Sequence, residues 1–522
     1  MYKNIIILSL LTALSPYLHA ERYHLVWTDA RQLLSDSCTA IVYAGISGEE
    51  AGGDFMHYEG SGNTEYRVGG YGTYATKQSG TLSGHIQYAR GKDRGIGWSA
   101  MRLPELYLPY ISTDSCGGNF TYDRYYAEGA YELPRMGAYT IDVRASFFGE
   151  EAWRLHDPRA LNNTTWLRFN AGVKAATKMG DVYLNLGYGR NKQHEQLRYW
   201  RPGQQDRFFV CYGFGLYDTR QSGVSFGKAR MYYINEFNAR LAYASPEEKP
   251  LHVTASLGYA RQHLETEESD IRCLYEATTN VLTPSVEVEY KRKDCPWQLR
   301  LSADARLLTR LGYENIIEEY LADVDYNTYD IRIIDSQQNY RRTDNTAAAA
   351  LEVRRHICGQ RAAVALEGGL TARGFEEKYS LGGYSIKVNT SMPHVKGSVF
   401  LHSSRDEASL SVFYGRQTVG THKYDVTMQN VKMKYLDFQQ AFAPYAYRAA
   451  DFSRTSVSAT YSHRFSRITA GITGTVTFDR GRRADDVAYT GTPGFKSTAP
   501  MIQAMPDRHD RDSGSLTLFL MF

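Results

Sequence analysis

The sequence lacks any long apolar run beyond its first twenty residues. No stretch of 18 or more apolar residues follows, which leaves no candidate for a transmembrane helix. The sequence also lacks an excess of positive or negative charge, with 60 Lys and Arg residues and 57 Asp and Glu residues. Nothing therefore indicates a nucleic-acid partner. The mean hydropathy of −0.46 would suit a soluble protein, but a β-barrel wall that turns every second residue to lipid has a similar value.

Residues 1–20 have the pattern of a signal peptide. Lys3 precedes the apolar run 5–14, and the short segment 15–20 ends in a small residue before Glu21. This order predicts cleavage before Glu21 and an exported protein. No cysteine stands at the cleavage point, so the signal does not resemble that of a lipoprotein.

Tyrosine and glycine are abundant, with 41 and 45 residues, whereas Met and Pro number only 12 and 15. Tyrosine suits the aromatic girdles that transmembrane barrels place at the two membrane interfaces. A soluble chain of 522 residues would usually divide into several domains. One large barrel accommodates the same length as a single unit.

From Gly117 onward the chain repeats a hairpin pattern with one apolar and one polar face. In the first hairpin the odd-numbered residues of 125–133 and 139–147 are apolar or small, with Glu128 and Asp142 between them. The later hairpins join 167–175 to 182–188, 237–243 to 251–259, 286–290 to 297–305, 347–353 to 364–370, 395–401 to 410–414, and 457–461 to 468–478. Such alternation predicts half-exposed strands.

The connections between these strands alternate between short turns and long polar loops. The long loops are 191–228, 308–345, 416–455 and 479–513, and this segregation is typical of short periplasmic turns and long extracellular loops. With 65–75, 80–91 and 514–522, seventeen strands can be named. A closed antiparallel barrel needs an even number, so we place one more around residues 54–59 and expect 18 strands, with 16 as the alternative.

The last strand carries a terminal signal. Leu516, Leu518, Leu520 and Phe522 share one face of an extended segment. The chain in this respect resembles bacterial outer-membrane β-barrels, whose assembly machinery reads such a terminus, and it looks like an uncharacterised family of that class. The resemblance implies an all-β fold with one antiparallel transmembrane barrel over residues 53–522 and a periplasmic or luminal segment over 21–52. It also implies location in the bacterial outer membrane.

The inward faces of the expected strands carry charges of both signs. The candidates for the lumen are Glu128, Asp142, Arg144, Arg168, Lys174, Glu236, Arg240, Glu287, Arg300, Asp304, Glu352 and Arg354. In one hairpin the alternation sets Glu287 opposite Arg300, within pairing distance. A lining that selects a solute and a salt-bridged wall that is merely rigid both fit this pattern. Charges of one sign would have favoured ion selectivity, and these are mixed.

Catalytic signatures are missing. Neither Gly-x-Ser-x-Gly nor His-Glu-x-x-His occurs, and His85, His156, His194, His263 and His402 are scattered singly. We therefore expect no enzyme, no cofactor and no metal site.

The leading hypothesis is a channel or surface receptor for solute uptake that is not energised by itself, because the N-terminal segment is too short to resemble the plug of a TonB-dependent receptor. One alternative is a non-conducting barrel that docks other envelope components. Another is a FadL-like transporter of hydrophobic substrates. Expected partners are outer-membrane lipids and lipopolysaccharide, the barrel-assembly machinery, and a surface lipoprotein or TonB-dependent receptor.

Six cysteines in an exported chain suggest disulfides. The expected topology puts Cys211 and Cys273 in outer loops and Cys295 and Cys358 in periplasmic turns. We accordingly predict the pairs Cys211–Cys273 and Cys295–Cys358. Cys38 and Cys116 remain as a third pair, which requires the N-terminal segment to rise through the lumen.

The topology makes a direct prediction for surface labelling. Epitope tags in the turns expected at the periplasmic side should be silent on intact cells, whereas tags near Gln204 or Asp335 should bind antibody. The silent positions follow Met136, Lys178, Pro246, Cys295, Cys358 and Asp406. Antibody binding at the short turns of intact cells would contradict the orientation, and permeabilised cells provide the control for expression.

Overall fold

The computed structural model describes residues 39–522 with several internal gaps. The gaps are 77, 115, 199–207, 214–215, 219–229, 247–248, 269–270, 293–294, 324–327, 358–360, 426–434, 437 and 484–507. The expected signal peptide, 1–20, therefore lies outside the described residues, as does most of the segment 21–52.

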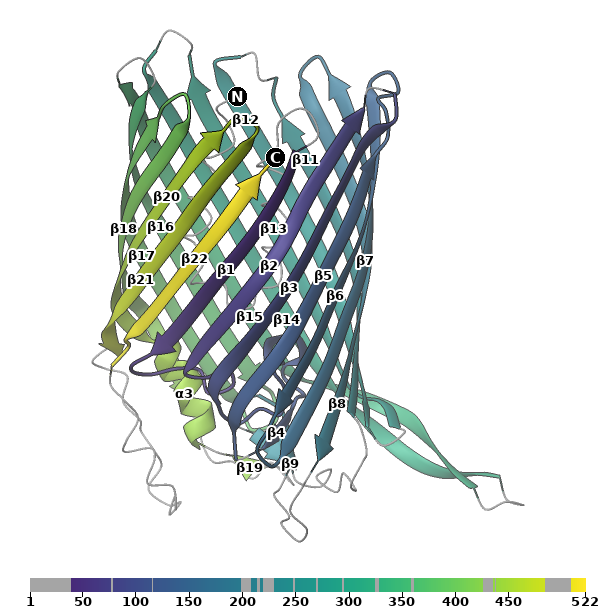
Figure 1. Ribbon diagram of the computed structural model, residues 1–522. Coiled ribbons are helices and arrows are strands. Elements are labelled where there is room, and N and C mark those ends of the chain that lie inside the picture. Colours follow the sequence, from purple (N-terminus) through teal and green to yellow (C-terminus); the bar gives the residue numbers. More distant parts are fainter. Residues whose placement is uncertain are drawn as a thin grey trace.

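The described chain forms one closed antiparallel β-barrel (Figure 1). The 18 strands of its wall confirm the predicted fold and strand number. They are β1 (Thr39–Ala51), β2 (Gly62–Thr76), β3 (Gly80–Ile96), β5 (Gly118–Glu132), β6 (Tyr139–Arg154), β7 (Arg159–Thr177), β8 (Gly180–Arg198), β11 (Arg230–Ala244), β12 (Leu251–Glu268), β13 (Ile271–Lys291), β14 (Trp297–Asp323), β15 (Thr328–Ile357), β16 (Ala362–Tyr379), β17 (Tyr384–His402), β18 (Asp406–Asp425), β20 (Ala450–Phe465), β21 (Ile468–Arg483) and β22 (Arg511–Met521).

The first strand of the wall is not where the sequence predicted it. We expected a strand around residues 54–59 and left 21–52 outside the wall, but β1 occupies Thr39–Ala51 and pairs with both β2 and β22. Its residues 41–44 are apolar in succession, and Gly45 and Gly48 leave one position without a side chain on each face, so the period of two is faint. Pairing with strands from both ends of the chain, which no local pattern reveals, holds it in place.

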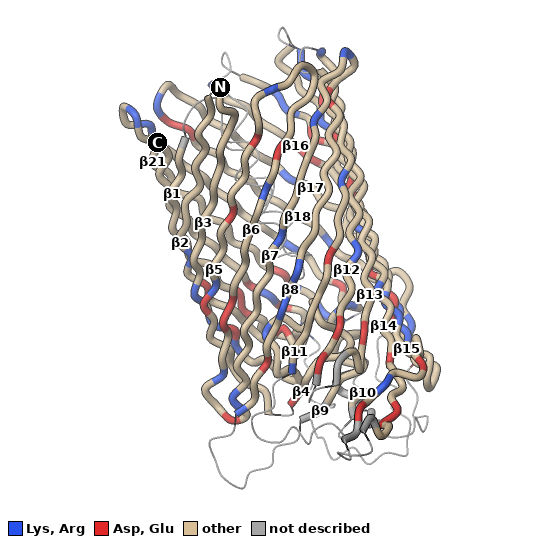
Figure 2. The backbone as a smooth tube through the Cα atoms, turned by 90° about the vertical axis from the view of Figure 1, so that its right-hand side faces the viewer, with Lys and Arg blue, Asp and Glu red and all other residues tan. Residues whose placement is uncertain are grey.

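The outer surface of the wall is apolar along its middle. Side chains such as Leu184, Leu257 and Leu301 are about half exposed, and on the same strands Asn185 and Ser256 form hydrogen bonds to neighbouring residues. Figure 2 shows that charged residues are common in the lower part of the barrel and at its tips. Among the described residues, no helix is long and apolar enough to cross a membrane.

The two ends of the wall differ. Thr39 begins β1 and Met521 ends β22 at the same end of the barrel, and the turns 133–138 and 466–467 lie at that end as well (Figure 1). At the opposite end the connections are longer on average, although 155–158 and 380–383 are short. Short turns mark the periplasmic side of such barrels and longer loops the extracellular side. We call the end opposite Thr39 and Met521 the outer mouth.

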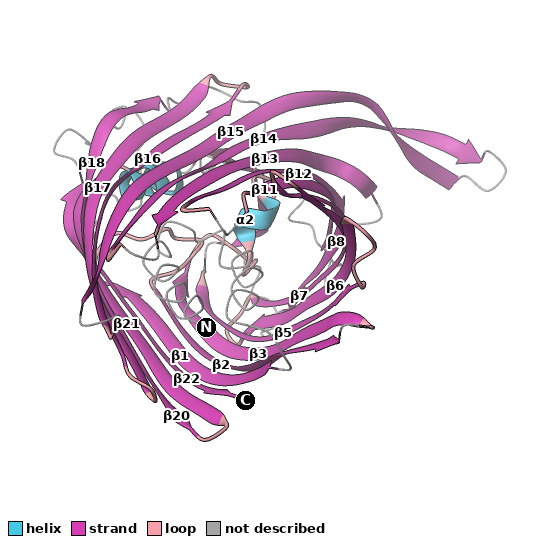
Figure 3. Ribbon diagram, turned by 90° about the horizontal axis from the view of Figure 1, so that it is seen from above, coloured by secondary structure: helices cyan, strands magenta, loops and turns pink. Residues whose placement is uncertain are grey.

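A layer of short elements lies at the outer mouth. The connection between β3 and β5, residues 97–117, contributes α2 (Pro104–Tyr107) and β4 (Ser112–Asp114). The small sheet orders β19 (Tyr435–Leu436), β10 (Leu216–Asp218), β9 (Phe208–Cys211) and β4, and α3 (Phe438–Arg448) lies beside it. Seen along the barrel axis, α2 lies inside the ring of strands (Figure 3). We call these elements the mouth layer.

One predicted loop is a pair of strands. The segment 308–345 was expected to be an outer loop, but β14 and β15 continue through it as paired strands as far as Asp323 and Thr328. The other predicted loops also begin or end inside strands, for instance at Arg198 and Asp425. Polar and apolar residues are mixed on both faces there, so the regular alternation that marked the strands stops before the hydrogen-bonded ladder does.

The lipid-facing position of Leu257 can be tested by substitution. Leu257→Arg should destabilise the barrel by about 2–4 kcal/mol, the cost of a cation at the mid-plane of the lipid-facing wall. Ser256→Arg, on the inward face of the same strand, is the matched control and should cost less. Reversible urea unfolding in phospholipid vesicles measures both, and equal losses would mean that the two faces have been exchanged.

Candidate functional site

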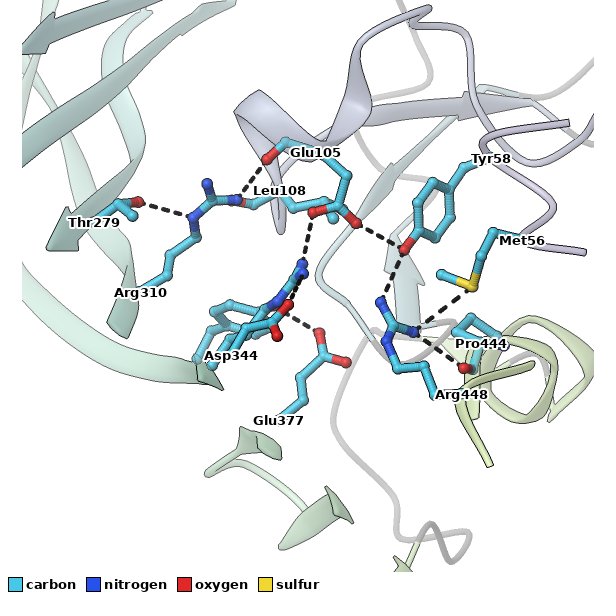
Figure 4. A network of polar contacts seen from close by, with 12 residues as sticks. Met56, Tyr58, Glu105, Leu108, Thr279, Arg310, Asp344, Glu377, Pro444 and Arg448 are labelled. Atoms are coloured by element: carbon cyan, nitrogen blue, oxygen red, sulfur yellow. Dashed lines mark hydrogen bonds and ion pairs between the residues drawn. The ribbon is translucent and has the colours of Figure 1, made fainter. Parts of the chain in front are cut away.

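A buried ionic network attaches α2 to the barrel wall. Glu105, in α2, accepts a hydrogen bond from Arg342 of β15 at 2.8 Å and another from the Tyr58 hydroxyl at 2.8 Å (Figure 4). The Arg342 side chain is 7% exposed and that of Glu105 is 17% exposed. A charge-assisted hydrogen bond between buried groups is strong. Removing one partner is costly, because the other charge then stays buried without compensation.

The carbonyl end of α2 is held by a second arginine. Arg310 of β14 donates to the backbone oxygen of Glu105 at 2.8 Å and to that of Leu108 at 3.2 Å. Its Nε donates to the hydroxyl of Thr279 on β13 at 2.8 Å. The last carbonyls of a helix have no partner within the helix, so Arg310 satisfies groups that α2 itself leaves open.

Tyr58 connects this network to α3. The guanidinium of Arg448, at the end of α3, donates to the Tyr58 hydroxyl at 3.3 Å and to the backbone oxygen of Pro444 at 3.1 Å. The same group lies 3.7 Å from the sulfur of Met56. Segments 56–58, 105–108 and 444–448, which are distant in sequence, therefore meet at one point of the mouth layer (Figure 4).

The surrounding charges keep Glu105 ionised. Burial by itself would raise the pKa of Glu105, but Arg342, Arg448 and Arg310 outweigh it and lower that pKa from 4.5 to about 2. The pKa of Tyr58 shifts upward, first because the hydroxyl is buried and then because the Glu105 carboxylate is adjacent. At neutral pH the network therefore contains an ionised carboxylate and a neutral phenol.

The β3–β5 connection is also attached to the other side of the barrel. Arg102 forms ion pairs with Asp93 of β3 at 2.8 Å and with Glu150 of β6 at 2.6 Å. Its guanidinium lies 3.4 Å from the centre of the Tyr122 ring. Asp114, farther along the connection, pairs with Arg154 of β6 at 2.7 Å. The segment 97–117 is thus held to β6 near both of its ends and to β15 through Glu105 between them.

Tyrosines fill the space between the anchors. Tyr110 stacks on Tyr275 with ring centres 4.9 Å apart, and the hydroxyls of Tyr212 and Tyr275 lie 2.8 Å apart. Together with Tyr340 and Tyr379 they belong to one buried cluster that reaches α3. Aromatic pairs add to the free energy gained from burial, so this packing stabilises the closed mouth beyond the ion pairs.

The charges expected in the lumen mostly contact one another. Four pairs link candidates directly: Glu128 with Arg144 at 3.5 Å, Arg168 with Glu236 at 2.9 Å, Glu352 with Arg354 at 2.9 Å, and Glu287 with Arg300. Asp142 accepts a hydrogen bond from Tyr183, Arg240 donates to Ser256, and Lys174 pairs with Asp181. These contacts fit the interpretation as a salt-bridged wall better than that of a selective lining. Asp304, on β14, is exposed, and no ion pair links it to another described residue.

The expected position of Glu287 opposite Arg300 is wrong in register. Glu287 directly faces Ser302, and Arg300 faces Glu289. Arg300 nevertheless reaches Glu287 diagonally and forms an ion pair with it. The alternation gave the correct face of each strand but could not fix which residues stand opposite each other, because the length of the turn sets that register.

The predicted disulfide Cys211–Cys273 does not form. Cys211 is buried in β9, and its sulfur accepts a hydrogen bond from the amide of Gly213. Burial raises the pKa of this thiol to about 12. The prediction failed because the loop that carries Cys211 folds into the mouth layer, where Cys211 packs with Tyr107 and Tyr232. The other two predicted pairs include Cys38 and Cys358, which lie outside the described residues.

The sequence analysis did not identify Glu105, Arg102, Arg310 or Arg342. One local signal was present, since Leu103-Pro-Glu-Leu-Tyr107 places a proline at the start of a helical turn. The arginines that meet it lie about 200 residues away in the sequence, and no local pattern links them to it. In the described parts of the chain, no group of three or more His, Cys, Asp or Glu side chains could hold a metal ion.

The chain belongs to a protein family of unknown function (DUF6850), whose profile matches residues 32–522. No curated protein matches it. A closed barrel with an apolar outer face and this topology is the architecture of bacterial outer-membrane proteins. The chain is accordingly an outer-membrane protein, as the terminal strand predicted.

Several solved structures are distantly similar. The ferric enterobactin receptor of Pseudomonas aeruginosa is 8% identical, with a TM-score of 0.38, and the match covers 92% of this chain and 80% of the receptor. BauA, the ferric preacinetobactin receptor of Acinetobacter baumannii, is 9% identical, with a TM-score of 0.42 and coverage of 94% and 80%. Likeness at this level transfers neither a ligand nor a mechanism to the present chain.

Glu105 provides a test of the mouth layer. Glu105→Gln removes one of the two carboxylates that Arg342 contacts and should lower the free energy of opening of the layer by about 3 kcal/mol. Native-state hydrogen exchange of the amides 105–111 measures that opening. Glu318→Gln, which removes an exposed partner of Arg332, is the control and should cost less than about 1 kcal/mol. Similar losses in the two variants would contradict the importance of the buried network.

The same network predicts an acid dependence. Because the pKa of Glu105 is lowered on folding, its stabilisation is complete above the ordinary value of 4.5 and declines as the pH falls towards about 2. The exchange protection of amides 105–111 should therefore be nearly constant from pH 7 to 5 and fall below pH 4. Glu105→Gln should abolish this acid-dependent loss.

Proposed function

We propose that this protein is an outer-membrane channel for solute uptake whose outer mouth is closed at rest by the mouth layer. The observation that carries the proposal is the pair of ionic anchors on the β3–β5 connection, Arg102 on one side and Glu105 on the other. They attach the layer to opposite parts of the wall, so their release would leave the described part of the segment held by an ion pair only at Asp114.

The chemistry of the anchors favours a closure that can open. A permanent seal is most stable as an apolar core, because buried ion pairs must repay the loss of water around both charges. Here the contacts at both ends of the segment are ionic and hydrogen-bonded, and they can be exchanged for contacts with water or with a polar solute. A solute that enters the mouth from outside would first meet this layer and compete for the same donors.

The local charge suggests the kind of solute that would compete best. Arg310, Arg342 and Arg448 converge on the single carboxylate of Glu105, and Arg373 joins Arg342 on Asp344. Guanidinium groups outnumber carboxylates in this cluster. A carboxylate or phosphate group on a solute would be attracted to the arginines and could displace Glu105 from them.

A second candidate is a barrel that does not conduct and serves to bind a partner. The tyrosine cluster between the mouth layer and the wall favours it, since Tyr110, Tyr340 and Tyr379 are almost fully buried and resemble a permanent core. For the third hypothesis, a route for hydrophobic substrates, no observation in the described residues provides support. All described wall strands are paired on both sides, and the inward faces carry ion pairs.

Single-channel recording in planar bilayers tests the proposal. The wild-type protein should be silent for most of the recording. Glu105→Gln combined with Arg102→Gln should produce frequent openings, because the described part of the segment then keeps an ion pair to the wall only at Asp114. Lys378→Gln, which removes an ion pair with Glu376 on the outer part of β16, is the control and should behave as the wild type. If the double variant folds as a barrel and stays silent, the proposal of a channel is wrong and that of a non-conducting barrel is favoured.

A further inference from the structure

Strands β14 and β15 extend beyond the rim as a free two-stranded ribbon. The last residue of β14 that pairs with β13 is Glu314, and the first residue of β15 that pairs with β16 is Tyr340. Beyond these points β14 and β15 pair only with each other, as far as Asp323 and Thr328. We call residues 316–323 and 328–338 the ribbon; at 3.3 Å per residue it reaches about 25 Å from the wall.

The ribbon points away from the barrel. It projects sideways past the rim in the side view and in the view along the axis (Figures 1 and 3). The register shifts at Gly312/Tyr313 and at Ile316/Ile317, and such bulges bend a ribbon and turn it to a new direction. None of the described loops packs over its length, since residues 330–338 are all exposed.

The exposed side chains of the ribbon are unusually apolar for a free surface. Ile331, Ile333 and Ile334 follow one another closely, and Ile334 is 56% exposed. The adjacent strand adds Ile316, Tyr320 and Leu321, each more than a third exposed. Isolated two-stranded ribbons are marginally stable in water, and exposed strand edges with isoleucine invite pairing with another chain.

The charges of the ribbon are mostly negative. Its described side chains include the carboxylates of Glu318, Glu319, Asp330 and Asp335 and one guanidinium, that of Arg332. Arg332 is already paired with Glu318 at 2.6 Å and lies over the ring of Tyr320. The carboxylate of Asp335 accepts a hydrogen bond from the amide of Ser336, and both Glu319 and Asp335 are exposed to a partner that covers the ribbon.

We propose that the ribbon docks a second protein at the cell surface, one that presents a basic and apolar face and adds to the free strand edge. Charge decides among the possible occupants. The phosphates of lipopolysaccharide would be repelled by the acidic ribbon. A second copy of this chain, related by a two-fold axis, would set one acidic ribbon against another. A partner rich in Lys and Arg satisfies both the carboxylates and the isoleucines.

Hydrogen exchange of the amides 331–334 provides the first test. Exchange should be fast in the purified protein held as single barrels in phospholipid nanodiscs. In outer-membrane vesicles from the native cells it should be at least ten-fold slower, because a partner protects the strand edge. Vesicles reconstituted from the purified protein and lipopolysaccharide should give the fast rate. Equal rates in nanodiscs and native vesicles, or slow exchange with lipopolysaccharide alone, would overturn the proposal.

Photo-crosslinking identifies what covers the ribbon. A photoreactive phenylalanine analogue at position 333 in native cells should yield one adduct with a different polypeptide of basic surface. The purified partner should then bind the full-length protein, with affinity at least ten-fold weaker for Asp335→Arg. Arg332→Gln is the matched control, because it changes the charge of the same ribbon without removing a carboxylate and should not weaken binding.

Three results would contradict the proposal: an adduct with a second copy of this chain, an adduct with lipopolysaccharide only, or equal binding by Asp335→Arg and the wild type. The ribbon lies outside the wall, so these substitutions leave the barrel pairings intact, and heat-modifiable migration of the folded barrel on gels verifies this for each variant. The outcome is independent of channel activity.

Discussion

The closure of the wall between β1 and β22 is the constraint on which the rest of the structure depends. Within lipid no water is present to satisfy backbone amides and carbonyls, so an open strand edge is costly and a sheet must close on itself. Eleven residue pairs, from Ile41–Met521 to Ala51–Arg511, make that closure here. It joins the two ends of the described chain. It also creates an interior whose space must be filled and whose polar groups must be paired or hydrated.

The mouth layer is a consequence of that inward surface. A ring of 18 strands is wider than side chains alone can fill, and at the outer end the gap is crossed by chain. Buried backbone and charges then need partners, and the anchors provide them: Arg310 serves the carbonyls of α2, and Arg342 and Tyr58 serve the carboxylate of Glu105. The same contacts thus stabilise the mouth layer and allow it to open, because an ion pair is strong only while both partners are present.

The two parts of β14 and β15 lie in different environments. Within the wall the strands are paired on both sides and present leucine to lipid, as at Leu301 and Leu351. Past the rim they lose those neighbours, keep only each other, and change to isoleucines and carboxylates. The first environment needs no further partner, whereas a free ribbon with two open edges does. A single pair of strands therefore links the membrane-embedded wall to the ribbon, the surface for which we propose a protein partner.

The sequence by itself determined the class of fold, because alternation with a period of two depends only on neighbouring residues and persists along most strands. The terminal run to Phe522 and the even strand rule gave 18 strands, although the faint pattern of β1 hid its position. Tertiary structure alone decided the register of Glu287 against Ser302, the burial of Cys211 in the mouth layer, and the meeting of Glu105 with Arg342. These depend on turn lengths and on contacts between residues up to some 240 positions apart, and such contacts exist only after the wall has closed.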